Sequence, residues 1–383
     1  MSIGPPHTYV TEGRKRGVSN QILRDSLEQA RKVQEKGLPP VLTLRHLSSL
    51  TNVEYKLLRK IVARRQDDAY RSFLITKHSG GKRVICVPHP SLKRVQRWIN
   101  QKILMNVSTH WRSYAYSRNS SIVDCAQQHC GCNWLIKLDI RQFFESITEI
   151  QVYQVFQNLG YQPLVSFELA RICTRTYSSY NELELNKKWL SQPEAYSVIP
   201  FYQYKYLGHL PQGAPTSPML ANLVCKLMDE ALFNIAHDEG LVYTRYADDI
   251  VLSSSDIHFT RKKAQSVIRK VSSVLTKYEF EPQHNKTSVV PPGARKLVLG
   301  LLVNNSTPRL TRTFKCKLER HIWAVGKFGL ANHAHHIGFD SIWGFVRHLE
   351  GLISYAMMVE RRFGESMQIA FQKTLDGNGW NNN

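Results

Sequence analysis

Two adjacent aspartates, Asp248 and Asp249, lie between short apolar runs in residues 243–253 (YTRYADDIVLS). This pattern predicts a strand, a tight turn and a second strand. Because side chains alternate faces along a strand, neighbouring acids on a plain strand would point apart, whereas a turn can present both to one small volume. The pair predicts either a metal-holding catalytic hairpin or a solvated Asp-Asp turn, which is the simpler interpretation.

A third acid, Asp139, ends the apolar segment Trp134–Ile140, which is typical of a buried strand. An unpaired carboxylate at the end of such a strand is costly, and coordination of a divalent cation would compensate it. Together with Asp248 and Asp249, this acid can hold two Mg²⁺ ions, one activating a 3′-hydroxyl and one steadying a triphosphate. The three acids with their apolar flanks therefore favour a metal site, and the Ile140 carbonyl is a candidate further ligand.

The chain is strongly basic: 51 Lys and Arg against 30 Asp and Glu give a net charge of +21 over 383 residues. Such an excess attracts a polyanion, most often nucleic acid, with an anionic membrane surface as the competing partner. No apolar run reaches the roughly 20 residues that a membrane span needs, and the N-terminus lacks the apolar core of a signal peptide. The seven scattered cysteines suit a reducing compartment, so we expect a cytoplasmic protein without a membrane partner.

Apolar periodicity outlines the remaining elements. A hairpin is predicted over Arg71–Pro88, closed by Gly80-Gly81, and a buried strand over Leu297–Val303. Helices are predicted over residues 20–36, 44–62, 92–107, 220–236 and 264–278, from Phe143 onward, and through most of the basic region after Leu310.

Four segments, in order along the chain, resemble motifs of reverse transcriptases. They are the fingers motif at 80–100 (GGKRVICVPHPSLKRVQRWIN), the first catalytic motif at 137–147 (KLDIRQFFESI), the LPQG…SP…N motif at 210–223 (LPQGAPTSPMLANL) and the YxDD box at 246–249 (YADD). The resemblance implies an α+β right-hand polymerase with an antiparallel palm sheet. Its expected parts are an N-terminal helical extension (1–65), fingers and palm (66–305) and a basic helical thumb (306–383).

Within this family the chain resembles the retron enzymes, which carry N-A-x-x-H before the first catalytic motif and V-T-G late in the palm. Here Cys125–His129 reads CAQQH and Val298–Gly300 reads VLG, so Cys stands for Asn and Leu for Thr. An abortive-infection or unclassified bacterial reverse transcriptase is therefore an alternative. A non-catalytic nucleic-acid-binding scaffold with a polymerase fold is the rival class, against which the intact acids argue.

The retron resemblance implies an RNA-directed DNA polymerase that uses Mg²⁺ and dNTPs and binds its own structured non-coding RNA. Such an enzyme primes from the 2′-hydroxyl of a guanosine and makes branched, multicopy single-stranded DNA. It also implies a role in antiphage defence with a separate effector protein, and it is compatible with a higher-order complex of open oligomeric state.

The resemblance also implies roles around the acids. Phe144, five residues after Asp139, would place a ring under the sugar and select deoxynucleotides, unless it is a core residue, for which Phe143 is the better candidate. Gln212 and Gly213 would line the nucleotide pocket, because a glycine lets backbone approach a substrate closely.

Three cations are expected near the triphosphate. Lys82 and Arg83, at the hairpin tip, would bind it as charge-assisted donors, with a solvated basic turn as the alternative. Lys286, in the late-palm segment Asn285-Lys286-Thr287, would place positive charge near the leaving pyrophosphate.

Three further regions have less specific signals. The cluster Cys125, His129, Cys130 and Cys132 is too cramped for the usual spacing of zinc ligands. The aromatic-rich insertion at about 176–209 is either a docking surface for a partner protein or the RNA, or a helical cover with buried rings. The thumb cations are expected to track an RNA–DNA hybrid as a stripe; they are Arg309, Arg312, Lys315, Lys317, Arg320, Lys327, Arg347, Arg361 and Arg362.

Overall fold

The computed structural model describes residues 6–65, 69–76, 80–176, 206–377 and 379–380. It begins with four helices, α1 (Pro6–Lys15), α2 (Asn20–Glu35), α3 (Leu44–Thr51) and α4 (Tyr55–Val62). The helix predicted over residues 44–62 is thus two helices, because Asn52 adopts a left-handed conformation (φ 51°) that ends α3. Buried residues of α3 and α4, such as Leu47 and Leu58, belong to the same hydrophobic core as the palm.

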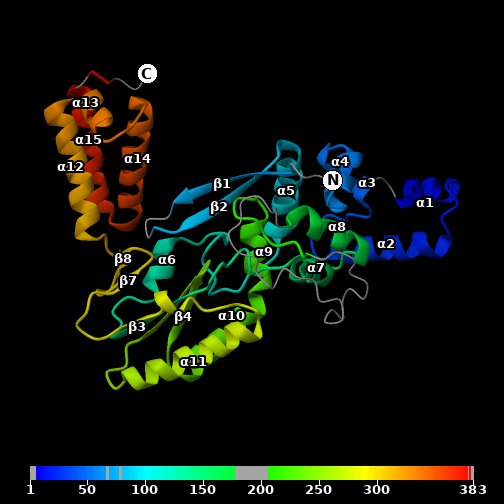
Figure 1. Cartoon of the computed structure of the whole chain (residues 1–383), viewed down its shortest axis with the longest axis horizontal. Coiled ribbons are helices and arrows are strands. Elements are labelled where there is room, and N and C mark those ends of the chain that lie inside the picture. The colour runs from blue at the N-terminus through cyan, green and yellow to red at the C-terminus, as the bar shows by residue number, and fades with distance from the viewer. Residues whose placement is uncertain (1–5, 66–68, 77–79, 177–205, 378, 381–383) are drawn as a thin grey trace.

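The fingers contain the predicted hairpin and the helix that follows it. Strands β1 (Tyr70–Thr76) and β2 (Lys82–Pro88) pair antiparallel, and α5 (Pro90–Lys102) starts directly after β2, with Pro90 in its first turn, followed by the short 3-10 helix η1 (Leu104–Asn106). In Figure 1 the hairpin reaches from α5 toward the thumb. The predicted hairpin is confirmed.

The palm is a four-stranded antiparallel sheet with the order β4-β5-β3-β6. Its strands are β3 (Trp134–Asp139), β4 (Val242–Tyr246), β5 (Asp249–Ser254) and β6 (Ser288–Val290). The helices around it are α6 (Ile122–Gln127), α7 (Glu149–Asn158), α8 (Pro163–Cys173), α9 (Ser217–Val224), α10 (Lys226–Asp238), α11 (Arg261–Lys277) and the 3-10 helix η4 (His284–Lys286).

Alternation along the strands gives the palm sheet two different faces. Ile136, Leu138, Ile250 and Leu252 project into the large core that the palm shares with the fingers and α3–α4. The opposite face carries Leu135 and Val251 into a second core, which it shares with the thumb, and carries Asp139 and Asp249 farther along the same strands.

Three further predicted elements differ from the structure. The helix expected from Phe143 onward begins only at Glu149, after a run of turns. The helix expected over 220–236 is interrupted at Cys225, where α9 ends and α10 begins. The strand expected over Leu297–Val303 is a small hairpin of β7 (Leu297–Val298) and β8 (Leu301–Leu302), whose turn residues Leu299 and Gly300 both have positive φ.

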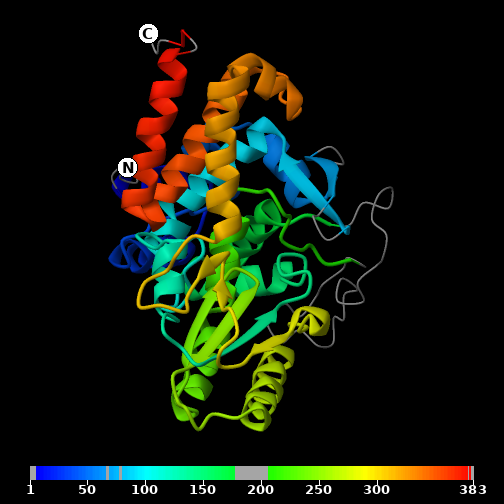
Figure 2. The same cartoon turned by 90° about the vertical axis from the view of Figure 1, so that its left-hand side faces the viewer.

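The thumb consists of α12 (Arg312–Phe328), α13 (Leu330–His336), α14 (Ile342–Val359) and α15 (Arg361–Gly377). Figure 1 shows these helices standing together at the opposite end of the molecule from α1 and α2, and Figure 2 shows them from the thumb end, above the palm strands. Their apolar faces meet in the second core, around Leu318, Phe345 and Phe371. The predicted α+β right-hand fold with an antiparallel palm sheet and a helical thumb is therefore confirmed.

Most of the aromatic-rich insertion at about 176–209, which we predicted as a docking surface or helical cover, lies outside the described residues. Of its ends, Arg175 and His209 form a backbone bridge. Within the described part of the chain, no helix combines the length and apolarity required to span a membrane.

Candidate active site

Three aspartates meet at one edge of the palm sheet. Asp139 and Asp249 are directly opposite each other in the β3–β5 register, so both project from the same face of the sheet. Asp248 occupies the two-residue turn between β4 and β5, and its carbonyl oxygen accepts a hydrogen bond from the Ile140 N–H at 3.0 Å. The predicted strand–turn–strand thus forms, and the register brings the third acid to it.

The turn has a constrained backbone. Ala247 has φ 55°, a left-handed conformation that a non-glycine residue adopts only at a cost, and its side chain is buried. Tyr246 and Asp249 are the last pair of the β4–β5 ladder, so Ala247 and Asp248 alone make the connection. A short, buried turn of this kind fixes the direction in which the two acids point.

Burial and neighbouring carboxylates disfavour the ionised forms of Asp248 and Asp249. Burial, followed by the neighbouring charges of Asp248 and Asp139, raises the pKa of Asp249 to about 6. Burial and Asp139 also raise the pKa of Asp248. Since desolvation and like charges both disfavour the ionised form, this edge of the sheet stabilises a cation placed beside it.

Lys286 supplies one such cation. Its Nζ lies 2.6 Å from Oδ2 of Asp139, and this hydrogen bond raises the pKa of the lysine. It is the last residue of η4, and the backbone just before η4 is tied to β3 because the Gln283 N–H donates to the Asp139 carbonyl oxygen at 2.7 Å. The structure therefore brings the predicted late-palm lysine to the first of the acids.

The donor set suits a hard divalent cation, because carboxylate oxygens are the ligands that Mg²⁺ prefers. In this structure the Asp139 carboxylate is directed to Lys286, and among the residues that the structure describes no three His, Cys, Asp or Glu side chains already form a metal cage. Burial and the neighbouring charges of Asp248 and Asp139, which together raise the pKa of Asp249, nonetheless make the site fit for a cation.

The two predicted hairpin cations differ in position. Arg83 is close enough to Asp248 and Tyr116 for its charge to lower the pKa of both groups, against the raising effect of burial. Lys82, one residue nearer the tip and paired with Thr76, is exposed, and no side-chain contact ties it to the acids. The structure thus brings Arg83, but not Lys82, to the candidate site.

Gln212 and Gly213 run beside the fingers strand β2. The Gln212 carbonyl oxygen accepts a hydrogen bond from the Cys86 N–H at 2.7 Å. Gly213 has φ 111°, and a Cβ at this position would lie 3.0 Å from the Cys86 carbonyl oxygen. The close approach that requires glycine here is therefore to β2, so the glycine holds fingers and palm together.

Phe144 and Phe143 have different surroundings. Phe143 is buried against Phe280, as predicted for a core residue, with ring centroids 6.0 Å apart. Phe144 is only partly buried, and its ring lies 6.4 Å from that of Tyr116. Tyr116 is half-exposed with φ 60°, and its pKa is raised by burial and by Asp248, which locates its ring near the acids.

The segment Cys125–His129 packs on the same sheet face as the acids. His129 is fully buried, with Nε2 2.7 Å from the Thr244 hydroxyl and Nδ1 2.7 Å from the Ser253 hydroxyl. Burial lowers its pKa to about 3, so the imidazole is neutral at pH 7. The Cys125 thiol also contacts the Thr244 hydroxyl, at 3.4 Å. Both ends of this motif therefore brace the β4–β5 hairpin.

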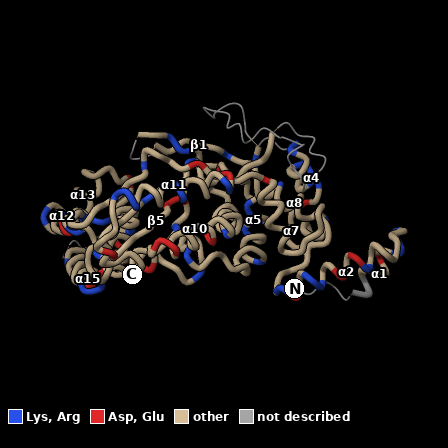
Figure 3. The backbone as a smooth tube through the Cα atoms, turned by 90° about the horizontal axis from the view of Figure 1, so that it is seen from below, with Lys and Arg blue, Asp and Glu red and all other residues tan. Residues whose placement is uncertain are grey.

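A basic groove of about 790 Å³ lies at the base of the fingers hairpin. Its walls include the side chains of Arg71, Lys93, Arg94 and Arg97 and the ring of Trp98. Within the described residues no acid lines this groove and no ion pair neutralises these four cations. Figure 3 shows basic positions along α5. Unneutralised cations beside an aromatic ring suit a single-stranded nucleic acid.

The thumb stripe is partly neutralised. Lys315 pairs with Glu360 at 2.6 Å, and Arg347 and Arg361 pair with acids on their own helices. The remaining predicted thumb cations have no ion pair among the described residues. Fewer thumb cations than the sequence predicts are therefore free of ion pairs and available to contact phosphates.

The palm sheet, its paired acids and the helical thumb define a right-hand polymerase. A family model described as reverse transcriptase (RNA-dependent DNA polymerase) matches residues 75–301, which is more than half of the chain. The chain belongs to this family and is an RNA-directed DNA polymerase.

Curated relatives are named retron reverse transcriptases. Retron Ec86 reverse transcriptase of Escherichia coli is 28% identical over 86% of this chain and 89% of its own length. Retron Mx65 reverse transcriptase of Myxococcus xanthus is 27% identical over 91% of this chain and 75% of its own length. Among solved structures, a telomerase from Candida albicans with a telomeric RNA fragment matches with a TM-score of 0.39 and 12% identity, over 81% of this chain and 63% of that one.

The sequence motifs miss several residues that shape the site. Tyr116 lies in a loop without a recognisable motif, and nothing in its neighbours indicates that it reaches Asp248. Arg245 and Asp229 form a buried ion pair next to the catalytic turn. A charged residue in the middle of the otherwise uncharged strand Val242–Tyr246 is the signal that could have identified Arg245.

Proposed function

We propose that this enzyme reverse transcribes part of its own structured non-coding RNA into multicopy single-stranded DNA. The reaction would start from the 2′-hydroxyl of a guanosine in that RNA, which gives a branched RNA–DNA product. The single observation that carries the polymerase chemistry is the register that pairs Asp139 with Asp249 beside the turn at Asp248. The retron names of the curated relatives support the choice of template and product.

Asp139, Asp248 and Asp249 would act as the metal ligands, with the Ile140 carbonyl as a further oxygen donor. Two Mg²⁺ ions bound there would activate the attacking hydroxyl and stabilise charge on the triphosphate. The raised pKa of Asp249 supports this role, since a cation relieves the repulsion that holds the proton. Lys286 would leave Asp139 and turn its ammonium toward the departing pyrophosphate.

The nucleotide would lie between the fingers hairpin and the palm. Arg83 is the better supported triphosphate ligand, because its charge reaches Asp248; Lys82 would join it only after the hairpin moves. Phe144 would exclude a ribose 2′-hydroxyl, as its partly buried ring beside Tyr116 allows. Gln212 and Gly213 would form the pocket wall on the β2 side.

The RNA would contact the basic groove of the fingers and the unpaired cations of the thumb, as the net charge of +21 supports. In this proposal residues 1–65 form the extension, 66–305 the fingers and palm, and 306–383 the thumb. We further propose that the enzyme works in the cytoplasm, in antiphage defence with a separate effector protein, and that the 176–209 insertion contacts that effector or the RNA.

The test is to express the gene with its upstream DNA in bacterial cells and to isolate branched RNA–DNA. We expect a branched species from the wild type and none from the double variant D248N/D249N, in which both side chains keep their size but lose their charge. Unbranched DNA from the wild type would contradict the 2′-hydroxyl priming. A branched product that persists in the double variant would refute the metal roles of the acids.

A further inference from the structure

Arg245 lies directly behind the catalytic turn, on the sheet face opposite to Asp249. We propose that Arg245 is a positioning residue: it fixes the Ala247–Asp248 turn and thereby the direction of the two acids. The proposal deepens the proposed function, because it rests on the role of Asp248 and Asp249 as metal ligands. It is carried by the contacts of the Arg245 side chain, which join the turn to a helix and to a loop.

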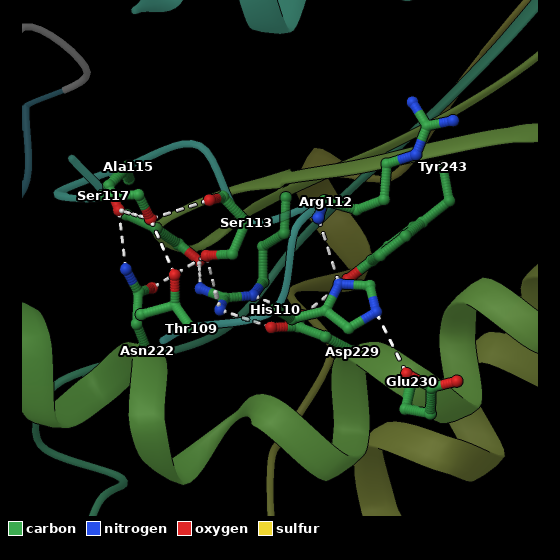
Figure 4. Close-up of polar contacts among 12 residues, drawn as sticks. Thr109, His110, Arg112, Ser113, Ala115, Ser117, Asn222, Asp229, Glu230 and Tyr243 are labelled. Carbon is green, nitrogen blue, oxygen red and sulfur yellow. Dashed lines mark hydrogen bonds and ion pairs between the residues drawn. The ribbon is translucent and has the colours of Figure 1, made fainter. Parts of the chain in front are cut away.

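The guanidinium group of Arg245 is fully buried and uses every nitrogen. Its Nε and Nη2 donate to the carboxylate of Asp229 on α10 at 2.6 and 2.7 Å. Nη2 also donates to the Ser113 hydroxyl at 3.0 Å, and Nη1 donates to the Ala247 carbonyl oxygen at 3.0 Å. Figure 4 shows Asp229 on its helix, below the loop that carries Ser113. One planar group thus connects three parts of the chain.

The contact with Ala247 is the one that bears on catalysis. Ala247 has a left-handed φ of 55°, and its carbonyl belongs to the peptide that leads into Asp248. A hydrogen bond from a fixed guanidinium holds this peptide plane in one orientation. Because Asp248 and Asp249 follow at once, rotation of that peptide would move both carboxylates.

The same network holds the loop that carries Tyr116. The Ser113 hydroxyl donates to Asn222 Oδ1 at 3.0 Å, and Asn222 Nδ2 donates to the Ala115 carbonyl oxygen at 2.6 Å. Asn222 is the asparagine of the LPQG…SP…N segment. Tyr116, which directly follows Ala115, adopts φ 60° and places its ring beside Phe144. The network therefore reaches the site from both the turn and the loop.

Stability alone is a poor explanation for this arrangement. A fully buried ion pair gains little over a well-packed apolar pair of similar volume, because both charges lose their hydration. Arg245 and Asp229 have no exposed surface. An apolar pair could fill the same space, but it could not bind the Ala247 carbonyl. Only the fork of an arginine bonds carboxylate, hydroxyl and carbonyl at once.

The test replaces the pair as a unit, with R245M/D229L, so that no charge is left buried alone. The control is R171M: Arg171 lies on α8, is equally buried and donates to the Val62 carbonyl oxygen at 2.9 Å, and its carboxylate partner Glu149 keeps the ion pair with Arg64. Three quantities are measured: amide hydrogen exchange of residues 243–250 in the metal-free protein, the Mg²⁺ concentration for half-maximal thermal stabilisation, and the rate of single-nucleotide addition on an RNA template.

For R245M/D229L we expect a folded protein with faster exchange at the turn. The Mg²⁺ requirement should rise and the addition rate at saturating substrate should fall, each by roughly 10- to 100-fold, which is typical when a residue that orients metal ligands is lost. The KM for the primer–template should stay unchanged. R171M should leave the exchange at the turn and the Mg²⁺ requirement as in the wild type, whatever it does to the melting temperature.

If R245M/D229L does not fold, R245K takes its place, because lysine keeps the charge beside Asp229 but cannot bond Ala247 as well. Wild-type exchange and Mg²⁺ requirement in either folded variant would overturn the proposal. A wild-type enzyme that Mg²⁺ does not stabilise would refute the metal roles instead. The exchange measurement, made without metal, would then still decide whether Arg245 holds the turn.

Discussion

On the two faces of the β4–β5 hairpin, a fully buried aspartate and a partly buried one differ in how their charge is compensated. On one face, Asp229 receives hydrogen bonds from Arg245 and Tyr243 and is fully compensated. On the other face, no cation among the described residues pairs with Asp249, and burial raises its pKa to about 6. The fold therefore compensates the carboxylate that pairs with Arg245 and leaves the carboxylate at the sheet edge without a counter-charge in the described part of the chain, as the proposed metal role of Asp249 requires.

The largest effect is expected from a substitution on the face that carries Asp249. D249N should lower the rate of nucleotide addition by about 1,000-fold or more, since a metal site contributes several kcal/mol to the transition state. The addition rate is measured on an RNA template with a DNA primer. Retention of more than a tenth of the wild-type rate would show that Asp249 is not a metal ligand.

Breaking the opposite face should instead destabilise the folded protein. D229N leaves Arg245 buried without its counter-charge, which costs about 3–5 kcal/mol in the free energy of unfolding. Urea denaturation of the metal-free protein measures this value, and Y243F, which removes one hydrogen bond to Asp229, is the milder control. Equal stability of D229N and wild type would remove the contrast between the faces.

The pH dependence of stability sharpens the comparison further. The folded pKa of Asp249, about 6, lies above its unfolded value near 3.8, so the folded state binds the proton more tightly. Stability of the metal-free protein should therefore fall as pH rises from about 4 to 7, by on the order of 2–3 kcal/mol from this group. D249N should flatten that part of the curve, and saturating Mg²⁺ should restore the loss at pH 7. An unchanged slope in D249N would contradict the raised pKa.

Variants of Lys286 test whether the ammonium group that pairs with Asp139 contributes to nucleotide addition. K286Q removes the cation 2.6 Å from Asp139 and should lower the addition rate by roughly 10-fold, with a higher KM for dNTP. K286R, which keeps the charge, should retain most of the activity. A rate unaffected by K286Q would limit Lys286 to a structural role.

The smallest effect is expected from the basic groove of the fingers, which lies outside both faces of the hairpin. R94Q/R97Q removes two cations of the fingers groove and should weaken RNA binding several-fold at low salt, with a shallower salt dependence, because fewer counterions are released. The Mg²⁺ requirement should not change. Binding measured by anisotropy between low and high salt gives the slope, and an unaltered slope would exclude the groove from the RNA path.

Much of this architecture could be predicted from the sequence because its signals are local. The hairpin of the fingers, the strand that ends at Asp139 and the turn at Asp248 each follow from apolar alternation within a few residues. The break between α9 and α10 at Cys225 could not, since no glycine or proline marks it. Likewise, Leu299 gives no sign of the turn that it makes with Gly300.

The candidate site was predictable to a similar degree. The apolar residues that flank the three acids identify them in the sequence, and the late-palm motif identifies Lys286. Tyr116 and Arg245 reach the site through contacts with residues distant in sequence, and tertiary packing of that kind leaves no periodic trace. The closeness of Gly213 to β2 shows the same limit: the glycine was predictable, but the backbone that it approaches was not.

The second core has a practical consequence for building hybrid enzymes. Leu135 and Val251 of the palm and Ala126 of α6 are buried together with thumb residues such as Leu318 and Phe345. A chain cut after residue 305 would expose these palm side chains on the very strands that carry Asp139 and Asp249. A thumb exchanged between two such polymerases must therefore bring its own partners for Leu135, Val251 and Ala126, or the graft will disturb the strands that hold the acids.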